Sequence, residues 1–317
     1  MSCFYLGVDG GQSSTTALIA DQTGRILGRG VGGPCNHVSG PEKKEKFFRA
    51  IGDCLEQACC EAGLDSSSIY FAAACLGFSG GAEDKEPCTR ELVRSANYKI
   101  THDAEIALAG ATNGQPGIIV IAGTGSMAFG RNVAGKTARA GGWGYIFGDE
   151  GGAFDLVRQA LRAALRFEEG WGPQTVLRDR LLTATGAQDA NDLLHRFYTD
   201  EFPRSKVAAL APLITAAALD GDEAAEEVVS TAAAQLTSLV EGVHRTLFEN
   251  FQVVPVCYIG GVFRSEPIRV AFAAEVLHSI GCVPGPPCYS PAAGAVLEAL
   301  RADANESQLS NVPESEK

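Results

Sequence analysis

The sequence contains no uninterrupted apolar run of about 18 residues, the length that a helix needs to cross a bilayer. We therefore expect no membrane-spanning segment. Near its first residue the chain also has no basic region followed by an apolar one, since a strand pattern begins at once. We accordingly expect no secretory signal and a cytoplasmic location.

Positive charge is scarce in this chain. Against 38 Asp and Glu there are only 26 Lys and Arg, which leaves a formal net charge of −12. Proteins that bind nucleic acids need a basic surface for the phosphate backbone, so we expect no nucleic-acid partner. The 45% of apolar and 20% of charged residues are typical of a globular protein, and 317 residues suffice for one large or two ordinary domains.

The ten cysteines form no CxxC pair, and no Cys/His spacing resembles a zinc site. Most of them stand among apolar residues, as in CLEQACC and AAACLGF, where cysteine behaves as a small hydrophobic residue. The simplest interpretation is a reducing compartment in which the thiols contribute to packing.

A helix is missing where two common phosphate motifs would need one. The stretch LGVDGGQSSTTALI contains a glycine turn, but TTALIADQTGRILGRG then alternates between apolar and polar residues and breaks at a second turn. P-loop and Rossmann sites place a helix N-terminus directly after their glycines. Both motifs are therefore excluded, and a hairpin of strands at residues 4–9 and 14–20 is predicted. Taken alone, that hairpin is equally compatible with an ordinary turn without a ligand.

The opening pattern recurs at AGTGS, residues 122–126, which also joins two predicted strands. Residues 5–32 and 118–142 thus form an internal duplication in pattern. It predicts two α/β domains, an N-terminal one over 1–113 and a C-terminal one over 114–302, followed by a polar and disordered tail over 303–317. Glycine amides and nearby hydroxyls can hold an anion, so two such hairpins indicate a clamp on a polyphosphate.

A third glycine turn, IGGVF at 259–263, completes a set that resembles the actin–hexokinase–Hsp70 ATPase superfamily. The likeness extends over the chain to about residue 301 and is closest to the N-acetylglucosamine kinase group of the BadF/BadG/BcrA/BcrD ATPase family. The segments that carry it are GVDGG, Asn36-His37, FSGG, HDA, AGTGS and GGWGYIFGDEGGA. The resemblance implies two RNase H-like (actin-like ATPase) domains with an interdomain cleft, and it suggests a homodimer.

The resemblance also implies an ATP-dependent kinase that phosphorylates the 6-hydroxyl of N-acetylglucosamine. Asp103 would be the general base, although an Asp at this point could also cap a helix. Asp9 would hold Mg²⁺ through water. The expected nucleotide-binding residues are Asp9, Gly10, Gly11, Ser13, Gly123, Thr124, Gly125, Ser126, Ala208, Gly260, Gly261 and Ser265. The expected sugar-binding residues are Asn36, Asp103, Gly142, Trp143 and Asp149. Core packing is the alternative for Trp143, and a helix N-terminus is the alternative for Asp149.

Two departures from the family pattern bear on the substrate. Val38 stands where an aromatic residue often follows Asn-His, and Gln12 stands where some members have glycine. The alternatives are a kinase of glucosamine or another amino sugar, or an ATPase activator of a CoA-ester dehydratase or reductase. The GGWGYIFGDEGG loop has no cysteine for the iron–sulfur cluster that such activators carry. A chaperone-like ATPase would need a further peptide-binding domain, for which the chain has no room.

Overall fold

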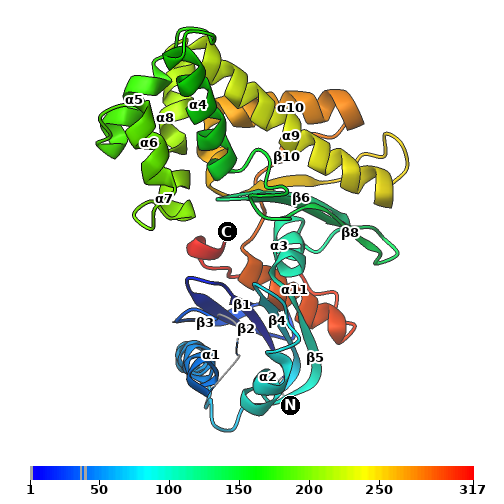
Figure 1. Ribbon diagram of the computed structural model, residues 1–317. Coiled ribbons are helices and arrows are strands. Elements are labelled where there is room, and N and C mark those ends of the chain that lie inside the picture. The colour runs from blue at the N-terminus through cyan, green and yellow to red at the C-terminus, as the bar shows by residue number, and fades with distance from the viewer. Residues whose placement is uncertain (1–2, 36–37, 39–40) are drawn as a thin grey trace. The chain divides into compact units, whose positions relative to one another are not determined.

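The computed structural model describes residues 3–35, 38 and 41–317, and its internal contacts divide the chain into two units (Figure 1). The first unit combines Met1–Gln115 with Pro287–Lys317, and the second spans Pro116–Pro286. Each unit is built around its own mixed five-stranded sheet. None of the helices in the described ranges is both long enough and apolar enough to cross a membrane.

The first unit has the strand order β3-β2-β1-β4-β5. Its strands are β1 (Phe4–Gly10), β2 (Thr15–Asp21), β3 (Ile26–Gly32), β4 (Phe71–Phe78) and β5 (Ser95–His102). The first three form an antiparallel meander, and β4 and β5 run parallel to β1. Its helices are α1 (Pro41–Ala62), α2 (Glu86–Leu92), α3 (Asp103–Ala111) and α11 (Pro291–Ala302).

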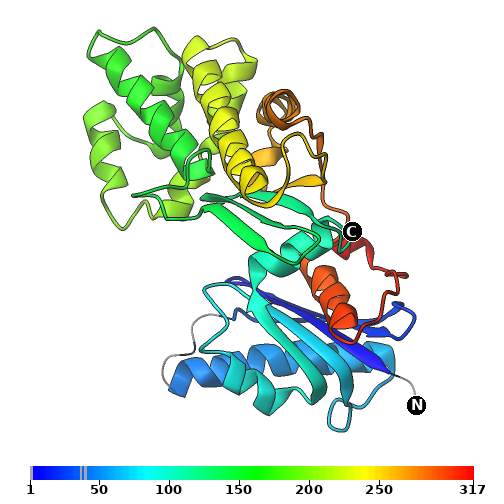
Figure 2. The ribbon, with the colours of Figure 1, turned by 90° about the vertical axis from the view of Figure 1, so that its right-hand side faces the viewer.

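Helices cover both faces of this sheet, as Figure 2 shows for α1 and α11. Alternate side chains of a strand point to opposite faces, which gives the unit two cores. Leu6 and Val8 of β1 pack in the core that α1 covers, and Tyr5 packs in the core that α11 covers. The α11 helix comes from the far end of the chain, so this unit cannot form from the N-terminal residues alone.

The second unit repeats this topology with the strand order β8-β7-β6-β9-β10. Its strands are β6 (Gly117–Ala122), β7 (Ser126–Arg131), β8 (Thr137–Gly141), β9 (Val256–Ile259) and β10 (Pro284–Gly285). Here too, three antiparallel strands are followed by two parallel ones. The predicted duplication is therefore present as two equivalent sheets, and each glycine hairpin joins the first two strands of its sheet.

Seven helices belong to the second unit. They are α4 (Ala153–Glu168), α5 (Leu177–Thr185), α6 (Ala190–Phe197), α7 (Arg204–Ala208), α8 (Ala211–Leu219), α9 (Glu223–Leu247) and α10 (Glu266–Ile280). The sequence predicts helices over 151–167, about 207–219, 222–250, 266–280 and 291–302, so it misses α5 and α6 and merges α7 with α8. A short 3₁₀ helix, η1 (Gly261–Arg264), follows β9, and another, η2 (Glu314–Glu316), ends the chain.

Most cysteines lie in the cores, as their apolar sequence context indicated. Seven of the ten are buried. Burial, with a smaller contribution from Cys35, raises the pKa of the Cys54 thiol to about 12, and burial likewise raises that of Cys59 to about 11. These two thiols stay protonated at neutral pH, so they act as packing groups and not as nucleophiles.

The structure differs from the expectation at the C-terminal end. Residues 287–317 belong to the first unit, and the polar tail is packed on it. Leu309 and Val312 are buried in the core beneath α11, and the Ser310 carbonyl accepts a 2.9 Å hydrogen bond from Ile26 N–H. Composition suggested disorder because the tail is mostly polar. Two spaced apolar side chains and pairing with the β3 backbone are enough to order it.

This packing makes the tail part of the stability of the first unit. We expect Leu309→Ala to lower the free energy of unfolding by about 2 kcal/mol, because it leaves a cavity in the core beneath α11. Denaturant titration measures the change. Glu306→Ala, at an exposed position in the same segment, is the matched control. If the tail were disordered, neither substitution would change the free energy of unfolding.

Candidate active site

The first glycine hairpin is fixed by its neighbours at the carboxyl edge of the first sheet. Across its turn, Gly11 N–H donates to the Ser14 carbonyl at 3.0 Å, and the Gly11 carbonyl accepts from Cys35 N–H at 2.9 Å. The Gly10 carbonyl accepts from Ser79 N–H at 3.2 Å. A side chain on Gly10 would collide with the Phe78 ring, so only glycine allows this close approach.

Strand register brings the candidate residues of this unit to one edge. A single row of paired residues crosses the sheet through Gly32, Thr15, Gly10, Phe78 and His102. Asp9 lies one residue before this row on β1, whereas Ser79 and Asp103 come one residue after it on their own segments. The predicted phosphate turn and the predicted base are thus on the same edge of the sheet, as their positions after strands implied.

Asp103 is the first residue of α3 and is half-buried. Its Oδ2 accepts a 2.6 Å hydrogen bond from Ser79 Oγ, and its Oδ1 accepts a 2.8 Å bond from Ala104 N–H. These two donors fix the carboxylate while leaving acceptor capacity on both oxygens. In the sequence FSGG is only a family motif and gives no sign of the Ser79 contact, because Ser79 follows β4 and Asp103 follows β5.

Asp9 has an unusual electrostatic environment. Burial is the largest cause, followed by the charges of Asp103 and Glu316, and together they raise its pKa from 3.8 to about 7. Glu316 itself is 4% exposed, and it accepts hydrogen bonds from Arg29 Nε at 2.7 Å and Ser290 Oγ at 2.6 Å. The C-terminal tail therefore contributes to the raised pKa of Asp9. A disordered tail would make no such contribution.

The residues around Asp9 suit a magnesium ion that keeps most of its water. Within the described ranges, no three His, Cys, Asp or Glu side chains form a cluster that could hold a metal ion. Mg²⁺ bound with a nucleotide uses one or two carboxylates, waters and phosphate oxygens, so it needs no such cage. A desolvated carboxylate near two further acids would be stabilised by a divalent cation.

The second hairpin, residues 123–125, rests on the start of α4. The Gly123 carbonyl accepts from Ala153 N–H at 2.8 Å, and the Thr124 carbonyl accepts from Phe154 N–H at 3.1 Å. Ser126 Oγ donates to the Glu150 carbonyl at 2.5 Å. The hydroxyl of Ser126 thus has a structural partner, while the turn itself stays a glycine loop like the first one.

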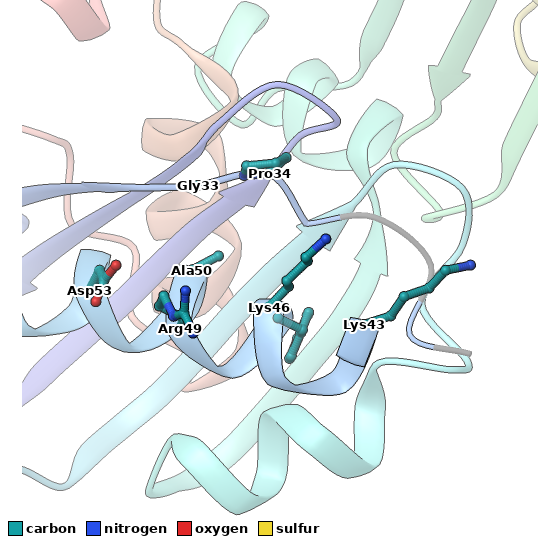
Figure 3. Close-up of a pocket in the computed structure, with 8 residues that line it drawn as sticks. Gly33, Pro34, Lys43, Lys46, Arg49, Ala50 and Asp53 are labelled. Carbon is teal, nitrogen blue, oxygen red and sulfur yellow. The ribbon is translucent and has the colours of Figure 1, made fainter. Parts of the chain in front are cut away.

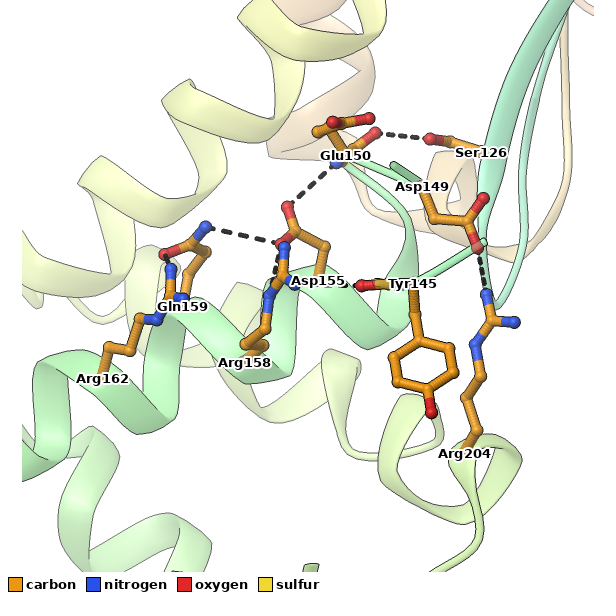
Figure 4. Close-up of polar contacts among 10 residues, drawn as sticks. Ser126, Tyr145, Asp149, Glu150, Asp155, Arg158, Gln159, Arg162 and Arg204 are labelled. Atoms are coloured by element: carbon orange, nitrogen blue, oxygen red, sulfur yellow. Dashed lines mark hydrogen bonds and ion pairs between the residues drawn. The ribbon is translucent and has the colours of Figure 1, made fainter. Parts of the chain in front are cut away.

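Asp149 lies directly against this hairpin (Figure 4). It is 6% exposed, has a left-handed backbone with φ +64°, and forms an ion pair with Arg204. A side chain on Gly125 would collide with the Asp149 carboxylate. A place at a helix N-terminus therefore does not by itself account for the contacts of Asp149. Arg204, which is 55 residues away in the chain, had no signal in the sequence.

Trp143 is 67% exposed, so core packing is the wrong interpretation of this residue. The guanidinium of Arg139 lies over its ring at 4.8 Å. Gly142 N–H donates to the Ser126 carbonyl at 3.0 Å, which ties the loop to the second hairpin. An exposed indole held at this place is available to a ligand.

The third glycine turn also approaches the second hairpin. Gly260 has φ +112°, and a side chain there would collide with the Ala122 carbonyl at the end of β6. Gly261 opens η1, and Ser265 precedes α10 with a buried Oγ that has no hydrogen-bond partner in the described part of the chain. Ala208 is buried at the end of α7. An unpaired buried hydroxyl suits a polar ligand atom.

Two remaining features concern the segment after β3. The predicted sugar ligand Asn36 lies outside the described residues. Beside it along the chain, Gly33 and Pro34 border a pocket of about 340 Å³ on the first turns of α1 (Figure 3). Lys43, Lys46 and Arg49 give that pocket a basic rim. It contains none of the residues expected to bind nucleotide or sugar.

Comparison with known proteins places this geometry among sugar kinases. The model of the BadF/BadG/BcrA/BcrD ATPase family matches residues 6–299. The chain is 32% identical over 268 residues to the N-acetylmuramic acid/N-acetylglucosamine kinase of Clostridium acetobutylicum, covering 83% of this chain and 86% of that protein. It is 29% identical over 280 residues to the N-acetyl-D-glucosamine kinase of Dictyostelium discoideum, covering 81% and 84%.

A solved structure agrees with these sequence relatives. A candidate N-acetylglucosamine kinase from Chromobacterium violaceum superposes with a TM-score of 0.70 at 26% identity, covering 93% of this chain and 98% of the other. With the paired sheet topologies, this match confirms the expected actin-like ATPase fold.

The raised pKa of Asp9 predicts how stability depends on pH. The folded state holds this proton up to about pH 7, whereas the unfolded chain releases it near pH 4, so rising pH destabilises the fold between these values. We expect Asp9→Asn to be more stable than the wild type by about 2 kcal/mol at pH 8. Denaturant titrations in EDTA at pH 5, 6.5 and 8 should show the gain shrinking toward low pH. A gain independent of pH would contradict this assignment.

Proposed function

The chain belongs to the BadF/BadG/BcrA/BcrD ATPase family, and we propose that it is an ATP-dependent amino-sugar kinase that phosphorylates the 6-hydroxyl of N-acetylglucosamine. The observation that carries the proposal is the half-buried Asp103 carboxylate, fixed by Ser79 at the sheet edge that also carries the first glycine hairpin. The names of the Clostridium and Dictyostelium relatives support the substrate.

In this proposal Asp103 takes the proton from the sugar hydroxyl as that oxygen attacks the γ-phosphorus of ATP. Ser79 and the Ala104 amide donate to the carboxylate and hold its direction, which keeps it aligned. The bond from the γ-phosphorus to the bridging oxygen breaks, and ADP leaves. Because phosphoryl transfer needs little covalent chemistry from the protein, positioning and charge stabilisation supply most of the rate.

The glycine hairpins would hold the phosphates. Gly10, Gly11 and Ser13 would serve in the first unit, and residues 123–126 would serve in the second, through backbone amides and hydroxyls. Mg²⁺ would neutralise charge on the β- and γ-phosphates, and Asp9 would hold it through water. Gly260, Gly261, Ser265 and Ala208 would border the adenosine.

The sugar would be bound by Asn36, Gly142, Trp143 and Asp149 together with the base. The exposed indole of Trp143 supports this role, because an aromatic face suits the apolar side of a pyranose ring. The alternative substrates, glucosamine or another amino sugar, would keep the same residues in the same roles. In either case the protein would act as a homodimer. A CoA-ester activator would hydrolyse ATP without any sugar.

Removing the base should separate binding from chemistry. We expect Asp103→Asn to lower kcat by about 100- to 10,000-fold, because the amide cannot accept the hydroxyl proton. Calorimetric Kd values for ATP and the sugar should stay within about threefold, since the shape and the Ser79 contact are kept. Turnover close to that of the wild type in this variant would reject Asp103 as the base.

The substrate is tested by coupled ADP release with N-acetylglucosamine, glucosamine, N-acetylmannosamine, N-acetylmuramic acid and glucose. We expect the highest kcat/KM with N-acetylglucosamine, because a pocket that hydrogen-bonds an acyl group discriminates against sugars that lack it. Preference for glucosamine would move the assignment to that sugar. Release of ADP that does not depend on any sugar would favour the activator class.

A further inference from the structure

Arg204 begins α7 and reaches the second glycine hairpin from a part of the chain without any family motif. A side chain on Gly125 would bring its Cβ within 2.8 Å of one terminal nitrogen of this guanidinium. The arginine therefore lies on the turn that is proposed to hold phosphate. Both belong to the second unit, so their contact is internal to one compact unit.

Two kinds of contact fix the orientation of this guanidinium. One terminal nitrogen pairs with Asp149 Oδ2, as Figure 4 shows. The ring of Tyr145 lies 5.2 Å from the guanidinium carbon and the ring of Phe154 lies 5.9 Å from it. Contacts of this type use the flat faces of an arginine, so its N–H donors remain directed outward in the plane.

One of those donors has no partner. Nε of Arg204 is buried, and no acceptor lies within hydrogen-bond distance of it among the described residues. Burying a donor without an acceptor costs about 1–3 kcal/mol, so such groups commonly await a ligand or a conformational change. Asp149, the ion-pair partner of Arg204, has a left-handed backbone, at φ +64°, which aspartate adopts more readily than most residues.

The hairpin itself offers a polyphosphate no charge. Residues 122–126 are AGTGS, so their contribution consists of amides and hydroxyls. Arg204 is a cation that the structure holds directly against this turn. An arginine presents paired donors in a fixed plane and so matches the geometry of a phosphoryl group better than a lysine does.

We propose that Arg204 binds the terminal phosphate of the nucleotide and stabilises it during transfer, with Asp149 as the residue that positions the guanidinium. This inference rests on the proposed function, since it takes ATP as the phosphoryl donor. It gives Asp149 a second role beside the proposed sugar contact. A sugar that binds Asp149 would thereby affect the position of Arg204.

The test compares two nucleotides that differ in the terminal phosphate. Calorimetry with Mg²⁺ measures Kd for ADP and for the non-hydrolysable ATP analogue AMP-PNP, without sugar, in the wild type, Arg204→Met and Arg204→Lys. We expect Arg204→Met to bind ADP within about threefold of the wild type and to bind AMP-PNP about 10- to 100-fold more weakly. Its turnover should fall by about 100- to 1,000-fold.

Arg204→Lys keeps the positive charge, and it provides the test if Arg204→Met does not fold. It should lose part of the preference for AMP-PNP, because an ammonium cannot reproduce the paired donors. Arg180→Gln is the matched control, since it breaks a 2.5 Å pair with Asp220 in the same unit away from the hairpin, and it should bind both nucleotides as the wild type does.

An unchanged ratio of the two Kd values in either folded variant would overturn the proposal, because a purely structural ion pair would affect both nucleotides equally. The proposed function is decided separately by turnover of the wild type with the sugars above. A wild type that phosphorylates no sugar would reject the kinase assignment while the nucleotide comparison still reports on Arg204.

Discussion

Close backbone approach at two glycine turns is the constraint on which the rest of this structure depends. Both hairpins lie between the first two strands of a sheet, and neighbouring groups approach Gly10 and Gly125 so closely that neither position has room for a side chain. The space left by the missing side chains is used by neighbours. The Phe78 ring packs against Gly10, and the Asp149 carboxylate packs against Gly125.

Each unit also pairs its hairpin with one oriented carboxylate. In the first unit Ser79 holds Asp103, and in the second Arg204 holds Asp149. The two donors differ in their charge. A hydroxyl orients the Asp103 carboxylate without adding a charge beside it. A guanidinium brings a full positive charge, which is useful where phosphate charge must be stabilised.

The C-terminal tail contributes both to the stability of the first unit and to the electrostatic environment of Asp9. It packs Leu309 and Val312 under α11 and brings Glu316 to Arg29 and Ser290. The acid at the end of the chain thereby contributes to the raised pKa of Asp9. A carboxylate kept at a high pKa destabilises the fold near neutral pH, and a bound cation would relieve that penalty. The proposed Mg²⁺ binding at Asp9 and the stability of the fold would thus be opposed, as is common at sites prepared for a charged ligand.

The sequence by itself determined most of the elements and their kind, although it did not indicate α5 and α6. Alternation and glycine turns predicted both hairpins, the absence of a helix after DGGQSS excluded the P-loop and Rossmann motifs, and the boundaries of α10 and α11 were predicted at 266–280 and 291–302 as observed. These features are local, since they follow from side-chain periodicity and backbone preference. Only the tertiary structure decided which distant residues meet: Ser79 with Asp103 across two strands, Arg204 with Asp149, and the tail with β3. Such contacts depend on strand order and helix packing, and a single sequence carries no local signal for them.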